Sequence, residues 1–223
     1  MRWISFALLL IAAHPAQAAR PVVLELFTSE SCSSCPPAEA LLAELARTRT
    51  DVLPLALHVD YWNRLNWRDR YTLPGATERQ RDYAARLGAG VYTPQLVADG
   101  HVQAVGSDRE AVAAAITRAQ ADAQAGPAMT VSRHAGQVTV RVGEGAGSGK
   151  VLLVGFDAAH STLVGAGENA GVRIDEVNVV RSLRSAATWT GKAVDFTAPE
   201  PNGEHIAAML QAPDGRILAV AQP

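Results

Sequence analysis

The chain has 223 residues, of which 48% are hydrophobic and 19% are charged, a balance that excludes a disordered chain and a coiled coil. Its formal net charge is -2, so there is no basic excess to drive binding to phosphate backbones, and we expect no nucleic-acid partner. With only two cysteines, the chain is not a disulfide-rich scaffold.

Residues 1–18 have the pattern of a secretory signal peptide. Arg2 supplies the positive charge, residues 3–13 form the apolar stretch, and Ala16-Gln17-Ala18 is a small-x-small cleavage pattern. The apolar stretch is too short to span a hydrocarbon core of about 30 Å, which argues against an anchoring helix. We therefore expect a periplasmic or secreted protein without stable membrane insertion after cleavage. Disulfides can form in such a compartment.

Residues 19–126 alternate between strand-like and helix-like segments, in the order β-α-β-α-β-β-α. Pro36 opens the first helical segment, Gly88 follows the second, and Asp99-Gly100 is a two-residue hairpin signal. Asp108 is placed to cap the third helix. The pattern predicts strands over 21–27, 52–59, 94–98 and 101–105, and helices over 36–45, 76–87 and 108–125.

Residues 127–223 follow a different pattern, which begins after the break at Gly126-Pro127. Short strand-like pieces recur there, separated by turns rich in Gly or Pro. Strands at this spacing predict an antiparallel β-sandwich-like domain. The expected strands are 129–133, 137–142, 151–156, 177–183, 193–196, 205–211 and 217–220.

The two cysteines form a Cys32-Ser33-Ser34-Cys35 motif between the first strand and the first helix. A C-x-x-C motif in this setting predicts a thioredoxin-like redox pair. A helix N-terminus favours a thiolate over a thiol, so we expect Cys32 to be exposed and to act as the nucleophile. Cys35 would then resolve the mixed disulfide. The prediction is a thiol-disulfide oxidoreductase that needs no cofactor, with a thiol or disulfide substrate and a separate redox-recycling partner.

Two other interpretations of the cysteine pair remain open. The pair could be an inert disulfide in a non-catalytic binding protein built on the same scaffold. It could also supply two thiolates to copper or another soft metal ion in a carrier protein. A second C-x-x-C motif, the usual completion of a zinc site, is absent from the sequence. His58 is the nearest plausible extra ligand, although a lone His at a strand end is more often packed or hydrogen-bonded.

Pro94 and Glu25 are further candidate site residues. Pro94 directly precedes the predicted hairpin, where thioredoxin folds place a cis proline that faces the cysteines. Glu25 lies within the first strand, at about the place of the buried acid of thioredoxins. A buried carboxylate there would have a raised pKa and could relay protons to the second cysteine. The alternative for Glu25 is a carboxylate on the more hydrated face of the strand.

Two other groups of residues have no assigned chemistry. The loop of residues 60–75 concentrates aromatic and Arg side chains, which suits either a recognition surface or packing of the loop against the protein itself. In the second half, turn formation and strand edges are sufficient explanations for several polar residues, namely His160, Glu168, Asn169, Asn178 and Arg181.

Several segments together resemble a secreted bacterial family of unknown function with a thioredoxin-like N-terminal domain. They are ELFTSESCSSCPPAE (25–39), LHVDYW (57–62), VYTPQLVADG (91–100), GENAG (167–171) and NVVRSL (178–183). The resemblance implies that Cys32, Cys35 and Pro94 occupy the thioredoxin positions. Ser31 replaces the aromatic residue usual before the first cysteine of a thioredoxin, and Ser33-Ser34 replaces the usual Gly-Pro or Pro-His. The redox potential and the direction of the reaction therefore do not follow from the resemblance.

Overall fold

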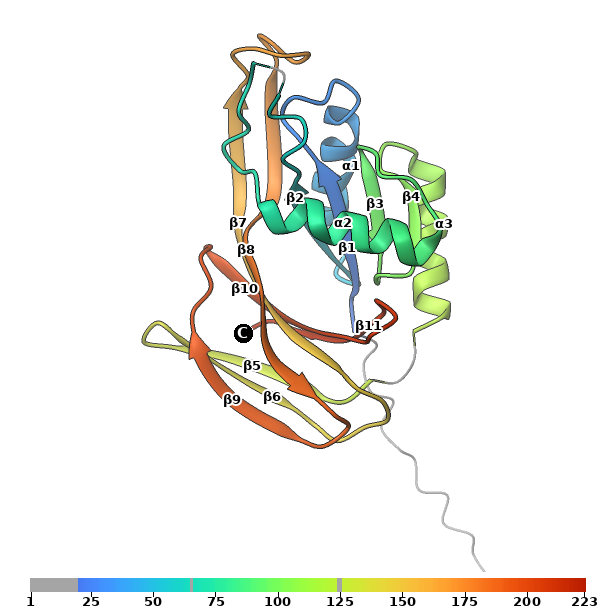
Figure 1. Ribbon diagram of the computed structural model, residues 1–223, viewed down its shortest axis with the longest axis vertical. Helices are drawn as coiled ribbons and strands as arrows, with labels where there is room; N and C mark the ends of the chain where they lie inside the picture. Colours follow the sequence, from blue (N-terminus) through green and yellow to red (C-terminus); the bar gives the residue numbers. More distant parts are fainter. Residues whose placement is uncertain (1–19, 65, 124–125) are drawn as a thin grey trace, which may run out of the picture.

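A computed structural model describes residues 20–64, 66–123 and 126–223, so the expected signal peptide lies outside the described residues. The described residues form three helices and eleven strands (Figure 1). In chain order these are β1 (Val22–Thr28), α1 (Pro36–Thr48), β2 (Val52–His58), α2 (Pro74–Leu87), β3 (Gln95–Ala98), β4 (Val102–Val105), α3 (Arg109–Ala121), β5 (Met129–His134), β6 (Gln137–Val142), β7 (Gly149–Leu163), β8 (Arg173–Trp189), β9 (Val194–Pro199), β10 (His205–Gln211) and β11 (Ile217–Ala221).

The helix boundaries follow from capping and from proline. Asp108 caps α3 by accepting a hydrogen bond from the Ala111 N–H, and Gly88 ends α2 in the left-handed conformation. Helix α2 begins at Pro74, two residues before the expected start, because proline at the first helical position gives up only an N–H that has no partner there. Helix α3 ends at Ala121, and the last two residues predicted for it, 124–125, lie outside the described residues.

Eight strands form one mixed sheet in the order β11-β10-β7-β8-β2-β1-β3-β4. Strands β1 and β2 are parallel, whereas β3 is antiparallel to β1 and β4 is antiparallel to β3. Strand β8 pairs in parallel with β2, with Val179 opposite Ala56. Four strands of the second half of the chain therefore continue the sheet of the first half, across the boundary expected after residue 126.

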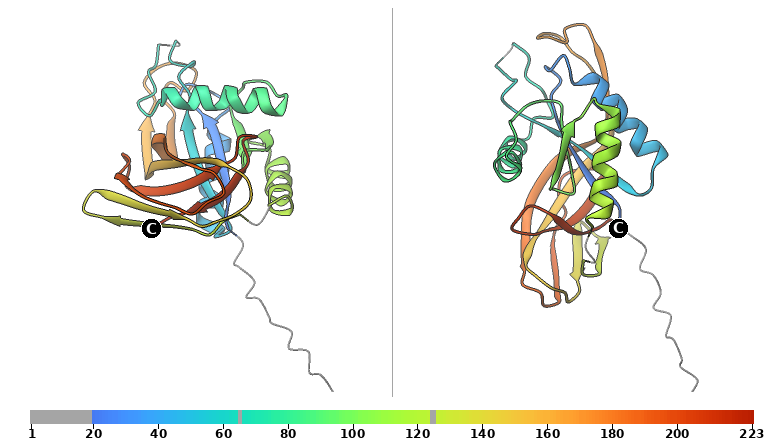
Figure 2. Two further views of the ribbon diagram at one scale, coloured as in Figure 1. Left: turned by 60° about the horizontal axis from the view of Figure 1, so that its bottom comes forward. Right: turned by 90° about the vertical axis from the view of Figure 1, so that its right-hand side faces the viewer.

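Helices cover both faces of this sheet (Figure 2). On one face, α1 and α3 pack on the side chains of Leu24 and Leu26 and also reach Val179 of β8. On the other face, Tyr83 of α2 packs in a cluster with Phe27 of β1 and with apolar residues of β7, β8 and β10. Both clusters include residues from the two halves of the chain, so the halves share their hydrophobic core.

A second sheet of three strands has the order β5-β6-β9. Alternate residues of β6 face inward, and they pack against Val151 and Leu153 of β7, against β10 and around the fully buried Trp189. The alternate residues of β7, such as Leu152 and Val154, point to the other face of the sheet and pack on the α2 side. The second half therefore contains two sheets packed face to face, although one of them extends into the first half.

Strands β7 and β8 are much longer than the expected strands over 151–156 and 177–183. The added residues include Asp157, His160, Arg173 and Asp175, whose polar side chains hide the strand pattern. Their backbones still pair continuously, up to Leu163 opposite Arg173. The long hairpin carries its tip to the end of the sheet where α1 starts (Figure 1).

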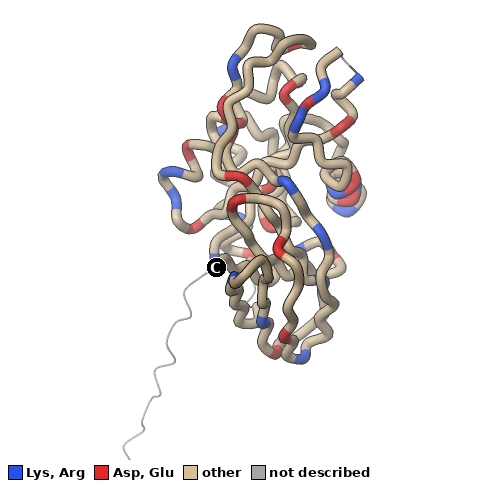
Figure 3. Tube along the Cα trace, turned by 90° about the vertical axis from the view of Figure 1, so that its left-hand side faces the viewer, with Lys and Arg blue, Asp and Glu red and all other residues tan. Residues whose placement is uncertain are grey.

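None of the helices in the described ranges is long and apolar enough to cross a membrane. Figure 3 shows Lys and Arg positions interspersed with Asp and Glu positions along the described trace, in agreement with the small net charge.

Candidate active site at the Cys32–Cys35 disulfide

Cys32 and Cys35 form a disulfide in the turn between β1 and α1, with their Cα atoms 5.4 Å apart. The Cys35 N–H donates to the Cys32 carbonyl, and Cys35 is the N-cap residue of α1. The next two residues, Pro36 and Pro37, have no N–H to leave without a partner at the helix start. The sequence thus places the sulfurs at the positive end of a helix, which stabilises a thiolate.

Thr93 contacts the sulfur of Cys32. Its hydroxyl donates to Cys32 Sγ at 3.3 Å, and it accepts a hydrogen bond of 2.8 Å from the Trp62 indole N–H. The Ser34 hydroxyl lies 3.4 Å from the same sulfur. Pro94 directly follows Thr93 in the sequence, and the Thr93–Pro94 peptide bond is cis. The indole N–H orients the Thr93 hydroxyl so that its proton points to the sulfur.

The expectation that Cys32 is exposed is wrong in this structure, because Cys32 is 0% exposed and Cys35 is 1% exposed. The tip of the β7–β8 hairpin lies on the cysteine loop. The Asn169 side-chain amide donates to the Glu30 and Cys32 carbonyls, both at 2.9 Å. Glu168 accepts from the Ser33 N–H at 3.2 Å and from its hydroxyl at 2.7 Å. We refer to residues 164–172 as the hairpin tip.

Glu25 does not lie beside the cysteines. It is fully buried on the α2 side of the sheet, where it forms an ion pair with Arg79 at 2.5 Å and accepts from the Tyr83 hydroxyl at 2.5 Å. Residues alternate between the faces of a strand, and its neighbours Leu24 and Leu26 face α1. Glu25 is therefore neither placed to relay protons to Cys35 nor located on a hydrated face of the strand. It is part of a buried ion pair.

The aromatic residues in the loop between β2 and α2 pack against the protein. Trp67 donates to Glu30 Oε2 at 2.7 Å, beside the cysteine loop. The Tyr71 ring stacks on His160 of β7 with centroids 4.3 Å apart, and the Arg181 guanidinium of β8 lies over the same Tyr71 ring, 5.3 Å from its centroid. Packing, rather than an exposed recognition surface, therefore accounts for these aromatic side chains.

A second polar group is buried at the ends of β1 and β2. His58 Nδ1 lies 2.8 Å from Asp69 Oδ2, and His58 Nε2 lies 3.5 Å from Glu176 Oε1. Burial alone would lower the pKa of His58, but the carboxylates of Asp69, Glu176 and Glu39 raise it to about 10. Burial raises the pKa of Glu176 to about 8 and that of Glu39 above its usual value. His58 contacts these acids rather than completing a site with the cysteines.

Sequence reasoning identified the cysteines and Pro94, but it did not assign Thr93, Glu168, Asn169, Glu39 or Glu176 to a site. Their signals in the sequence are weak, because a Thr before Pro and a Glu-Asn pair between glycines are each common in turns. Only the long hairpin brings residues 168–176 to the end of β1, more than a hundred positions earlier in the chain.

Comparison with known proteins identifies the family. Residues 23–211 match the family of proteins of unknown function DUF1223, and the chain belongs to this family. A crystal structure of protein AGR_C_4864 from Agrobacterium tumefaciens is similar, with 30% identity and a TM-score of 0.78 over 93% of this chain and 95% of that one. HBP35 of Porphyromonas gingivalis has a similar fold at 13% identity, with a TM-score of 0.65 over 92% of this chain and 75% of that one. No curated protein matches the chain.

Proposed function

We propose that this protein is an exported thiol-disulfide oxidoreductase, with a thioredoxin-like unit that carries a Cys32–Cys35 redox pair. The observation that carries the proposal is the disulfide at the start of α1, with the Thr93 hydroxyl at the sulfur of Cys32. The sheet order β2-β1-β3-β4, with α1 and α3 on one face and α2 on the other, supports the thioredoxin-like assignment.

The chemistry is an exchange of disulfides. In the reduced protein, the Cys32 thiolate attacks one sulfur of a substrate disulfide, which forms a mixed disulfide and releases one substrate thiolate. The Cys35 thiolate then attacks Cys32 Sγ, which forms the Cys32–Cys35 disulfide and releases the second thiolate. Two electrons pass from the protein to the substrate. In the reverse direction, the disulfide accepts two electrons from a substrate dithiol.

The second half of the chain has a defined part in this proposal. The hairpin tip is bonded to the cysteine loop and both cysteines are buried, so we infer that exchange requires the tip to move away from this loop. Only thiols that can displace the Asn169 and Glu168 contacts would therefore reach the disulfide. The substrate and the recycling partner are thiol or disulfide compounds in the periplasm or outside the cell.

Burial of both sulfurs favours a second candidate, a binding protein whose disulfide stays closed. The copper-carrier interpretation needs two free thiolates, which the disulfide does not offer in this oxidised state.

Equilibration of the protein in glutathione buffers, followed by acid quenching and mass spectrometry, distinguishes the candidates. We expect a reversible two-electron transition between about -270 and -120 mV, the range of known oxidoreductases. The Cys35→Ser variant should trap a mixed disulfide through Cys32, whereas Cys32→Ser should trap little. A pair that stays oxidised below about -300 mV and traps no thiol in either variant would favour the binding protein.

A further inference from the structure

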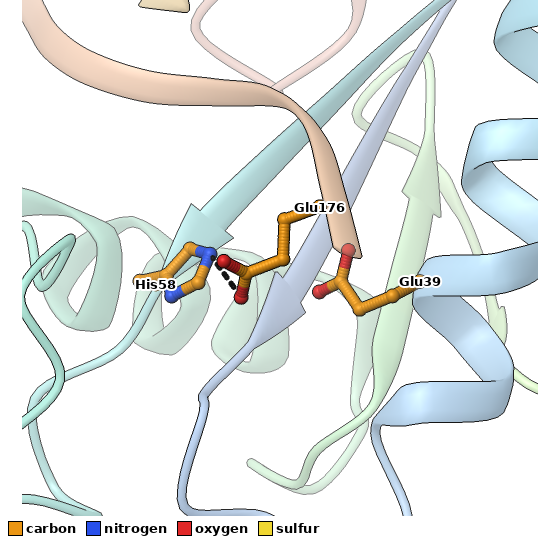
Figure 4. Close-up of side chains that lie close together, drawn as sticks. All are labelled: Glu39, His58 and Glu176. Atoms are coloured by element: carbon orange, nitrogen blue, oxygen red, sulfur yellow. Dashed lines mark ion pairs between the residues drawn. The ribbon is translucent and has the colours of Figure 1, made fainter. Parts of the chain in front are cut away.

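Four buried acidic and basic residues from four separate segments meet beneath the cysteine loop. Glu39 comes from α1, His58 from the end of β2, Asp69 from the loop that follows β2, and Glu176 from β8. The four side chains are between 0% and 2% exposed. Figure 4 shows the Glu39 and Glu176 carboxyl groups and the His58 ring directed toward one another. Water-exposed charges need no partner, but charges in such a dry place do.

The hydrogen bonding of this group is incomplete within the part of the chain that the structure describes. Both carboxyl oxygens of Glu39, Oε2 of Glu176 and Nε2 of His58 are buried without a hydrogen-bond partner. Most buried polar atoms in folded proteins have a partner, and an ordered water or ion is a common explanation for one that does not. Glu39 is the clearest case, because neither oxygen of its buried carboxyl group has a donor in hydrogen-bond geometry, although the Thr28 hydroxyl is near enough to lower the pKa of Glu39.

His58 is oriented as a metal ligand would be. Asp69 lies 2.8 Å from Nδ1, and Asp69 also accepts from the backbone N–H groups of Glu30 and Tyr71 at 2.9 Å. Asp69 is thereby held in place, and it fixes the proton of His58 on Nδ1. An ion would take the place of the proton on Nε2, which faces Glu176 Oε1 at 3.5 Å, and this gives the carboxylate–histidine–metal arrangement common in metalloproteins.

We propose that Glu39, His58 and Glu176 bind one divalent first-row transition-metal ion, with zinc and manganese as the best fits. One ligand atom from each of these residues lies within 4.8 Å of the others, so small side-chain movements would bring all three to an ion. The carboxylates of Glu39 and Glu176 would neutralise the +2 charge of the ion, and the Asp69 carboxylate would stay hydrogen-bonded to the Nδ1 proton of His58. This balance removes the cost of burying the two carboxylates without partners.

The donor set selects the class of ion. Imidazole suits zinc and iron, carboxylates suit manganese, and magnesium and calcium prefer oxygen ligands alone, so a mixed set of one imidazole and two carboxylates favours a transition-metal ion. Copper(I) prefers sulfur, and no cysteine belongs to this group. The site is therefore different from the copper site considered for Cys32 and Cys35, and it does not depend on the proposed redox function.

The ion would join α1 and β2 to β8, and so the two halves of the chain. Through Asp69, which accepts from the Glu30 N–H, it would also hold the loop that carries Cys32. We therefore assign it a structural role that fixes the start of α1 and the cysteine loop.

Metal analysis of the whole protein tests the site. The protein is unfolded in guanidinium with EDTA, refolded with its disulfide intact, and dialysed with zinc or manganese chloride. We expect one ion per chain to survive gel filtration, and Tm to rise by roughly 5–10 °C at a hundredfold excess over Kd. Less than a tenth of an equivalent of either ion, with no change in Tm, would overturn the proposal.

Isosteric variants test the ligands. Glu39→Gln and Glu176→Gln keep the side-chain volume and remove one charge each, and each should abolish the metal-dependent rise in Tm. Glu168→Gln, an exposed carboxylate at the hairpin tip, is the matched control and should bind metal as the unchanged protein does. The double variant Cys32→Ser, Cys35→Ser should also retain one ion per chain.

These outcomes separate this site from the redox proposal. Metal that is lost only in the cysteine variant would overturn the assignment and favour a thiolate site. Full binding by both Glu39→Gln and Glu176→Gln would also overturn it. A redox-inactive protein that binds one ion through these two carboxylates would refute the proposed function and leave the metal site supported.

Discussion

At Cys32, the local environment favours a reactive sulfur. The sulfur lies at the start of α1, and the hydroxyls of Thr93 and Ser34 approach it within 3.4 Å. After reduction, both hydroxyls and the helix N-terminus would stabilise the thiolate, because each places positive charge near it. The resulting low pKa would keep the nucleophile ionised at neutral pH.

Thr93→Val removes the hydroxyl at Cys32 but keeps the side-chain shape. A hydrogen bond to a charged group contributes about 1.5–3 kcal/mol, so we expect the pKa of Cys32 to rise by at least about one unit. Alkylation by iodoacetamide in the Cys35→Ser background should become about tenfold slower at a pH below both pKa values. Thr93→Ser retains the hydroxyl and should restore the rate. Equal rates in all three proteins would show that the Thr93 hydroxyl does not stabilise the thiolate.

Glu25 is expected to affect stability rather than redox chemistry. Glu25→Gln leaves the Arg79 charge in a buried place without its partner. Breaking a buried pair in this way costs about 3–5 kcal/mol, measurable by guanidinium denaturation. The reduction potential of the cysteine pair should stay within about 10 mV of the original value, since 30 mV corresponds to about 1.4 kcal/mol. A larger change would indicate that Glu25 acts on the cysteines after all.

At the scale of elements, we expect the β7–β8 hairpin to control access to the buried disulfide. Its tip lies against the cysteine loop and against Trp67, where a side chain in place of Gly165 would come within 2.8 Å of the indole ring. Opening the tip breaks two hydrogen bonds from Asn169 and two to Glu168. These contacts are local, so the tip can open without unfolding of the shared core.

Asn169→Ala should accelerate reduction of the disulfide. The variant removes the side-chain donor of the buried Glu30 carbonyl, which costs about 1–3 kcal/mol in the closed state, and leaves the Cys32 carbonyl with the Cys35 N–H as its donor. We expect reduction by a water-soluble phosphine to become about tenfold faster. Asn178→Ala is the control, because Asn178 also donates to a carbonyl, that of Pro54, but at the β2–β8 junction. An equal increase in both variants would indicate general destabilisation rather than opening of the tip.

The contact of Glu168 with Ser33 should depend on pH. The two hydrogen bonds from Ser33 lower the pKa of Glu168, so their contribution is present above the pKa of the unfolded chain and is lost as the pH falls through the folded value. A phosphine reduces disulfides in acid as well as at neutral pH. At pH 6, Glu168→Gln should therefore be reduced faster than the unchanged protein, and the two rates should approach each other as the pH falls through the lowered pKa of Glu168. A ratio that does not change with pH would contradict this role of the carboxylate.

On the scale of the whole molecule, the two halves depend on each other. One sheet passes through both halves, and the cluster on the α2 side combines residues of β1 and β2 with residues of β7, β8 and β10. Each half alone would expose a large apolar surface. We therefore expect one cooperative unfolding transition rather than one for each half.

Phe156→Ala tests this cooperativity. Phe156 is 3% exposed in the shared cluster, and truncation of a buried Phe costs about 3–5 kcal/mol. The midpoint of guanidinium denaturation should shift to a lower concentration. The shift should be the same whether unfolding is followed by circular dichroism or by the rate at which the disulfide is reduced in denaturant. Separate transitions for the β-rich half and for the cysteine loop would show that the halves fold independently.

The local features of the fold could be predicted from the sequence. Strand and helix periodicity located the β-α-β-α-β-β-α order, and the spacing of Cys32 and Cys35 located the disulfide at a helix start. These features depend on residues near one another in the chain, through side-chain period, capping and proline. The small charge and the cysteine count likewise follow from composition alone.

Which distant residues meet at the site depends on the packing of the whole chain. The polar residues of β7 and β8 have no apolar alternation, so neither the length of the hairpin nor its cover over Cys32 could be predicted. The face of β1 that Glu25 occupies depends on which helices cover the sheet, which a single strand pattern does not encode. Glu39, His58 and Glu176 converge because β8 pairs with β2, and backbone pairing between distant strands leaves little signal in the side chains.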